Sequence, residues 1–139
     1  MNTYANDLPY WKTGKSSAES WMNKTEKLIT EAGGEVDTRI SGKPNGKEAI
    51  LFIFMLEGAR YKILWPVLPT KKIDEQPAAL RQCATMIYHD TKARVLRLKI
   101  FPPKVVFSDY LIGPNGQTLA EIGQADIPKA LIQISKSIQ

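Results

Sequence analysis

Residues 48–66 decide the fold, and they read Glu-Ala-Ile-Leu-Phe-Ile-Phe-Met-Leu-Glu-Gly-Ala-Arg-Tyr-Lys-Ile-Leu-Trp-Pro. Glu48–Leu56 is apolar at nearly every position, as expected of a central strand that is covered on both faces. Glu57-Gly58 then predicts a tight turn. Beyond the turn, one set of positions holds Ala59, Tyr61, Ile63 and Trp65, and the alternate set holds Arg60, Lys62 and Leu64. Pro66 then ends the strand. The stretch therefore predicts two antiparallel strands joined by a hairpin turn.

A third strand and a helix precede this pair. Glu35–Ile40 alternates polar with branched or apolar residues, and the turn-rich segment Ser41–Gly46 follows. Further upstream, Ser17 offers a hydroxyl cap, apolar residues recur near helical spacing, and Gly33-Gly34 ends the run. We predict a first helix followed by a three-stranded antiparallel meander.

A second and longer helix is predicted downstream of the meander. It begins near Gln76-Pro77, because proline suits the first turn of a helix. Its core stripe consists of Leu80, Cys83, Ile87 and Thr91. The next segment, Arg94–Ile100, fits either a continuation of the helix or a strand, and Pro102-Pro103 ends both.

Two further elements complete the predicted α+β fold. Asn115-Gly116 lies between short apolar flanks in Tyr110–Glu121, a pattern that predicts a β-hairpin. Ile127–Ile138 has the spacing of a short amphipathic C-terminal helix. We expect residues 16–139 to form a single domain and residues 1–15 to form a flexible N-terminal arm.

The composition is that of an ordinary globular protein. The chain has 139 residues, of which 43% are hydrophobic and 24% charged, so it can bury a core without disulfides or metals. Its single cysteine, Cys83, indicates a reducing compartment. The start of the chain lacks the apolar region of a signal peptide, and the longest apolar run, Ala49–Leu56, is too short to span a bilayer. We expect a cytoplasmic protein with no cofactor and no membrane contact.

No residue pattern predicts catalysis. The only histidine, His89, has Asp90 beside it, but adjacent helical positions do not face each other, so no acid–base pair follows. Cys83 lies on an apolar stripe, which favours a buried and inert thiol. Carboxylates at the strand ends could bind Mg²⁺ in a small nuclease, but the companion lysine of such sites is missing; these carboxylates are Glu35, Asp37 and Glu48. We therefore predict that the protein is not an enzyme.

Several short motifs resemble those of a family of small uncharacterised proteins from bacteriophages and other bacterial mobile elements. Arg60–Pro66 is similar to the family's basic-aliphatic strand that ends in proline, and Arg81-Gln82 and Lys92-Ala93 are similar to positions in its long helix. Tyr110–Thr118 with Glu121 resembles its hairpin, although Gly-Pro-Asn-Gly replaces Leu-Pro-Asp-Gly. The resemblance favours a helix for the segment before Pro102 and implies a role in DNA metabolism or host interaction.

The positive charge of the chain is concentrated in one block. Residues 92–104 hold five Lys and Arg and no Asp or Glu, which equals the net charge of +5 of the whole chain. Such asymmetry favours an anionic partner, although cations also suit a helix C-terminus. Cations on the polar faces of the outer strands could extend the surface, and Phe52 or Phe54 would add stacking if it shared their face. The predicted nucleic-acid-binding residues are Arg39, Arg60, Lys62, Lys92, Arg94, Arg97, Lys99 and Lys104.

The sequence thus leads to a binding protein, with nucleic acid as the first partner to consider. We expect an accessory protein of phage or mobile-element DNA metabolism that binds single strands. The alternative is a protein-interaction module, which would dock on a host or phage protein or act as a subunit of an oligomer through exposed apolar surface. A solvated basic helix end without a partner is the third reading of the charge block.

Overall fold

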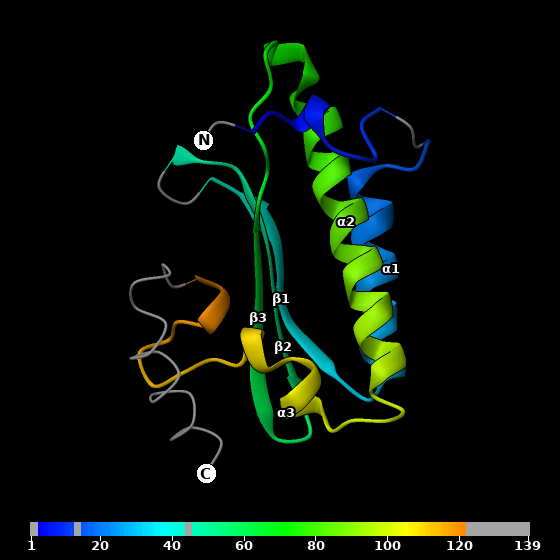
Figure 1. The fold of residues 1–139 in the computed structure, drawn as a ribbon, viewed down its shortest axis with the longest axis vertical. Coiled ribbons are helices and arrows are strands. Elements are labelled where there is room, and N and C mark those ends of the chain that lie inside the picture. Colours follow the sequence, from blue (N-terminus) through cyan, green and yellow to red (C-terminus); the bar gives the residue numbers. More distant parts are fainter. Residues whose placement is uncertain (1–2, 13–14, 44–45, 122–139) are drawn as a thin grey trace.

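The computed structural model describes residues 3–12, 15–43 and 46–121. It contains a three-stranded antiparallel sheet in the order β1-β2-β3 with two long helices on the same face (Figure 1). The strands are β1 (Glu35–Gly42), β2 (Ala49–Leu56) and β3 (Ala59–Pro66), and the helices are α1 (Ala18–Glu31) and α2 (Gln76–Arg97). The predicted N-terminal helix, meander and long helix are confirmed, as is the α+β class.

Local signals set the ends of these elements. The hydroxyl of Ser17 accepts a hydrogen bond from the backbone N–H of Ser20, which caps α1 as predicted. Glu57 and Gly58 both have positive φ, 49° and 80°, the geometry of the tight turn that suits the twist of paired strands. The undecided segment Arg94–Ile100 is helical up to Arg97 and closes in a hydrogen-bonded turn.

The alternation of β2 separates the two faces of the sheet. Its inward residues are fully or almost fully buried against the helices; they are Ile50, Phe52, Phe54 and Leu56. We call the opposite surface the open face, and its apolar residues are Ile40, Leu51, Ile53, Met55 and Leu64. On it Ile40 is 54% exposed and Met55 38% exposed. Within the described residues, the helices cover one face of the sheet, whereas the sequence predicted that both faces of β2 would be covered.

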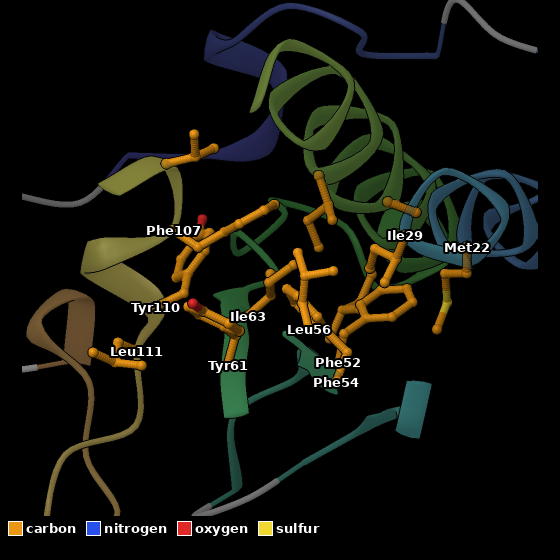
Figure 2. Close-up of a cluster of buried hydrophobic side chains, with 14 of the residues drawn as sticks. Met22, Ile29, Phe52, Phe54, Leu56, Tyr61, Ile63, Phe107, Tyr110 and Leu111 are labelled. Carbon is orange, nitrogen blue, oxygen red and sulfur yellow. The ribbon is translucent and has the colours of Figure 1, made fainter. Parts of the chain in front are cut away.

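The core lies between the sheet, the helices and a short segment that follows α2 (Figure 2). This segment consists of α3 (Pro103–Val106) and η4 (Ser108–Tyr110). Phe107, between them, lies 5.4 Å from Phe54 and 5.6 Å from Tyr61, measured between ring centroids. Aromatic rings therefore complete the core near the Glu57-Gly58 turn that joins β2 to β3.

The predicted hairpin at Tyr110–Glu121 is wrong. Asn115-Gly116 does form a tight turn, with the N–H of Gly113 bonded to the carbonyl of Gln117 at 2.9 Å. The flank before the turn adds to β3 instead of pairing with the flank after it, because Leu111 bridges Tyr61. The chain then ends its described part in η5 (Leu119–Glu121). The predicted helix Ile127–Ile138 lies outside the described residues.

Residues 3–12, which we expected to belong to a flexible arm, are packed against α2 and the loop before it. Ala5 is fully buried, and its N–H donates to the carbonyl of Pro69 at 3.0 Å. The buried amide of Gln82 donates to the carbonyls of Ala5 and Pro9 at 2.7 and 2.9 Å. A buried polar side chain needs such partners, so Gln82 fixes the course of this segment.

Candidate interaction surface at the end of the long helix

The five cations of residues 92–104 divide into two groups, because Arg94 points into the molecule. Its Nε lies 2.8 Å from Asp90, and its Nη1 and Nη2 lie 2.6 and 2.8 Å from the two carboxylate oxygens of Asp109. Nη1 also donates to the carbonyl of Val106 at 3.1 Å, and only 15% of the side chain is exposed. Arg94 thus forms a bidentate salt bridge with Asp109 inside the protein.

Tyr110 completes this arrangement, which we call the arginine clasp and define as Asp90, Arg94, Asp109 and Tyr110. The Tyr110 ring centroid lies 4.2 Å from the guanidinium carbon, and its hydroxyl accepts a hydrogen bond from Trp65 Nε1 at 2.8 Å. Burial raises the pKa of Tyr110 to about 12, so the hydroxyl stays protonated near neutral pH. The clasp joins the end of α2 to η4 and thereby fixes the chain between them.

The charges inside the clasp hold the guanidinium in its cationic form. Burial of Arg94 opposes the charge, but its hydrogen bond to Asp109 and the negative charges of Asp90 and Asp109 outweigh burial and raise the pKa of Arg94. Residues 91–108 contain no Asp or Glu. The two carboxylates that flank this stretch, Asp90 and Asp109, are both bound to Arg94.

The other four cations lie on the same stretch of chain as four exposed apolar side chains, from the last turns of α2 to α3. Leu96 is 64% exposed, Ile100 77%, Phe101 44% and Val105 49%. Lys92, Arg97 and Lys99 are exposed, and Lys104 is half-buried. We call this region the basic-apolar corner, and it consists of Lys92, Leu96, Arg97, Lys99, Ile100, Phe101, Lys104 and Val105.

Local geometry explains why these apolar side chains stay outside. The turn after α2 is closed by the N–H of Ile100, which donates to the carbonyl of Arg97 at 2.9 Å. Pro102 is then extended, with ψ at 157°, and α3 begins at Pro103. Two prolines keep the helix from continuing, so the chain reverses direction between α2 and α3 (Figure 1). Ile100 and Phe101 are exposed in this reversal. The predicted binding residues of this segment were its cations; the apolar residues directly before Pro102-Pro103 are the signal in the sequence for the exposed apolar group.

The three cations predicted on the sheet do not share a surface. Arg39 is in register with Phe52, on the helix-covered face, and its Nη1 lies 3.5 Å from Glu26 of α1. Arg60 and Lys62 lie on the open face, where Arg60 pairs with Asp37 at 3.5 Å and Lys62 with Glu121 at 2.8 Å.

The aromatic part of the expected sheet surface is absent as well. Phe52 and Phe54 are fully buried under the helices, because the alternation of β2 turns both rings inward. The combined cationic and aromatic sheet surface that the sequence suggested therefore does not form on the described residues. Of the eight predicted cations, the four in the basic-apolar corner are Lys92, Arg97, Lys99 and Lys104.

The catalytic candidates are engaged elsewhere. His89 stacks on Tyr10, with ring centroids 5.1 Å apart, and Asp90 beside it binds Arg94. Burial, aided by the charge of Glu48, raises the pKa of Cys83 to about 12, so its thiol is neutral near neutral pH.

The candidate metal ligands do not come together, because Glu48 lies far from Glu35 along the strands. Glu35 is in register with Met55, whereas Glu48 directly precedes Ala49, which is in register with Gly42 at the other end of the strands. Among the described residues, no group of three or more His, Cys, Asp or Glu could hold a metal ion. A hollow of about 540 Å³ lies near Glu48, with Lys43, Lys47 and Gln76 among its lining residues.

Within the described part of the chain, no helix combines the length and the apolar character needed to cross a bilayer. Comparison with protein-family models, with curated proteins and with solved structures finds no match. The resemblance to bacteriophage proteins therefore stays a prediction.

Proposed function

We propose that the protein is a non-enzymatic interaction module that docks on a partner protein through the basic-apolar corner. The observation that carries this proposal is the exposure of Leu96, Ile100 and Val105 among cations. Protein interfaces have this anatomy, an apolar centre inside a polar rim, whereas exposed apolar groups of this kind are uncommon without a partner. The matching partner surface is an apolar pocket bordered by carboxylates.

The two kinds of side chain would have different roles in binding. Burying Ile100 or Leu96 contributes about 1.5–3 kcal/mol each by removing apolar surface from water. The cations of the rim mainly raise the rate of association and select against basic surfaces. The arginine clasp supports both roles, because it holds the corner in place before binding and so lowers the entropic cost.

Nucleic acid is the second candidate, and the pair Arg97 and Phe101 favours it. The guanidinium carbon of Arg97 lies 5.7 Å from the Phe101 ring centroid, so a cation and a partly exposed aromatic ring lie together. A base stacked on such a ring gains about 1–3 kcal/mol, and the neighbouring lysines would contact phosphates. This candidate ranks second because the three other exposed apolar side chains of the corner are aliphatic. It would suit single strands in phage or mobile-element DNA metabolism.

The first experiment compares Ile100→Ser with Ile73→Ser, since Ile73 is 85% exposed and lies outside the corner. Both immobilised variants and the unchanged protein are incubated with bacterial cell extract, and captured proteins are quantified by mass spectrometry. We expect a partner that the unchanged protein and Ile73→Ser retain equally and that Ile100→Ser loses about tenfold. Equal capture by all three proteins would contradict docking through the corner.

The second experiment separates the two candidates. Fluorescence anisotropy with labelled single-stranded and double-stranded oligonucleotides is measured at low and at physiological salt. Salt-sensitive binding that weakens in both Arg97→Glu and Phe101→Ala would transfer the proposal to nucleic acid. Absence of binding at low salt, together with the Ile100-dependent capture above, supports the protein partner.

A further inference from the structure

A group of aromatic rings lies where the N-terminal segment meets the two long helices, which lie side by side (Figure 1). The Tyr10 ring stacks on the His89 ring, with centroids 5.1 Å apart and an angle of 14° between the planes. Trp21 of α1 lies against two side chains of α2, 5.8 Å from His89 and 5.1 Å from Tyr88 between ring centroids. The rings therefore form one cluster that is built from three separate segments of the chain.

The Tyr10 ring is held in this position by the protein itself. The amide of Gln82 donates to the carbonyl of Pro9, directly before Tyr10, at 2.9 Å. Tyr10 has a φ of 66°, in a region that residues with a side chain adopt only where their surroundings enforce it. Although His89 covers one side of the ring, Tyr10 is 40% exposed. A flat ring that is fixed and partly exposed is a platform on which another planar group can stack.

Two exposed lysines border these rings. Lys24 Nζ lies 4.2 Å from the Trp21 ring centroid, and Lys92 Nζ lies 6.0 Å from that of Tyr88. Neither lysine takes part in an ion pair with another described residue, so both charges are available to an anion. We call this region the aromatic-lysine surface, and it consists of Tyr10, Trp21, Lys24, Tyr88, His89 and Lys92, the last of which it shares with the basic-apolar corner.

We propose that the aromatic-lysine surface binds a single strand of nucleic acid. Tyr10 stacks on an unpaired base, and Lys24 and Lys92 contact neighbouring phosphates. Rings and cations together bind single strands because every base has a flat face and every nucleotide carries a negative charge. In a duplex the bases stack on one another, so their faces are not open to Tyr10. A protein partner would have to supply planar groups and carboxylates separately, whereas each nucleotide supplies both features.

The test measures the fluorescence anisotropy of a labelled oligothymidylate with the full chain, at low and at physiological salt. The matched probe is an abasic strand of the same length, because it carries the phosphates without the bases. We expect the oligothymidylate to bind about tenfold more tightly than the abasic strand, and both to bind more weakly as the salt concentration rises. Equal affinities for the two strands, or absence of oligothymidylate binding at low salt, overturn the proposal.

Two pairs of substitutions locate the binding surface. Tyr10→Phe keeps the ring and Tyr10→Leu removes it, so we expect only the leucine to weaken oligothymidylate binding, by about tenfold. Lys24→Gln removes a cation of the surface, whereas Lys27→Gln removes a cation one turn further along α1, where Lys27 pairs with Glu31 at 3.9 Å. We expect Lys24→Gln to weaken binding severalfold and to reduce its salt dependence, and Lys27→Gln to change binding by less than about twofold.

The same measurements separate this surface from the corner. Lys24 is exposed, so Lys24→Gln tests the proposal with the fold intact even if Tyr10→Leu releases the N-terminal segment. Binding that Arg97→Glu and Phe101→Ala weaken, but Tyr10→Leu and Lys24→Gln leave unchanged, places nucleic acid at the corner and overturns the proposal. Capture of a protein partner that depends on Ile100, without any oligonucleotide binding, supports the proposed function and overturns binding at the aromatic-lysine surface alone.

Discussion

Arg94 and Arg97 lie one turn apart on α2, yet they belong to two regions with opposite properties. Arg94 is bound to two carboxylates in the arginine clasp, and 15% of its side chain is exposed. Arg97 is exposed in the basic-apolar corner, 5.7 Å from a partly exposed aromatic ring. The difference shows that a block of like charges in a sequence can contain both a structural ion pair and a binding surface. Substitutions in pairs test this division.

The largest expected effect compares two phenylalanines, Phe107 beside the clasp and Phe101 in the corner. Phe107 is 1% exposed and contacts two aromatic rings, so Phe107→Ala should lower the free energy of unfolding by about 3–4 kcal/mol. Phe101→Ala should lower it by about 1 kcal/mol or less, because the ring is already partly in water. Urea denaturation measures both values, and equal losses would show that the corner is part of the core.

The next comparison concerns the two arginines themselves. Arg94→Met removes the only cation from Asp109 and Asp90 in the clasp, and we expect a loss of about 2 kcal/mol in the free energy of unfolding. The value is below that of a fully buried pair because Asp109 is 37% exposed. Arg97→Met, the matched control, should change stability by about 0.5 kcal/mol or less.

The binding assays sharpen the same contrast. If the clasp only positions the corner, Arg94→Lys should keep part of the stability and retain partner capture, since a lysine keeps the charge but not the two-pronged geometry. Arg97→Met should leave stability intact while it alters association. An Arg94→Met protein that is as stable as the unchanged one would remove the distinction between the two regions.

The smallest expected effect lies at the other end of α2, where an exposed ion pair joins Lys12 to Glu75 at 2.8 Å. The hydrogen bond from Lys12 lowers the pKa of Glu75 below its ordinary value of 4.5. The pair therefore stabilises the packing of residues 3–12 at pH values above 4.5. This contribution is lost as the pH falls through the lowered pKa that Glu75 has in the folded protein. Carboxyl NMR shifts should titrate at a higher pH in Lys12→Gln than in the unchanged protein. Identical titrations would show that the pair does not form in solution.

Local patterns predicted much of the fold. These patterns depend only on residues that are close in the sequence; they are the alternation of Ala59–Trp65, the Ser17 cap and the prolines around α2. The elements that they predicted are present. The hairpin failed because its first flank bridges Tyr61, a residue about fifty positions earlier. Periodicity within a segment does not reveal such a competing strand.

The candidate site was less accessible to sequence reasoning. The charge block indicated the right end of α2, but the partner of Arg94, Asp109, lies 15 residues away and is brought close only by the reversal at Pro102. The burial of Phe52 followed from which face of β2 the helices cover, and a strand that is apolar on both sides leaves that choice open. The exposed apolar group at Ile100 became visible only with the turn that places it outside.

The anchoring of residues 3–12 has a practical consequence for work on this protein. Ala5 is fixed beside Pro69 and Gln82 near the start of α2, whereas the basic-apolar corner lies at the end of this helix, which is about 33 Å long (Figure 1). A label or surface linkage near the N-terminal segment would therefore be held at the opposite pole of the molecule. Immobilisation there presents Ile100 and Arg97 to the solution, so it is the orientation in which capture and binding experiments should be made.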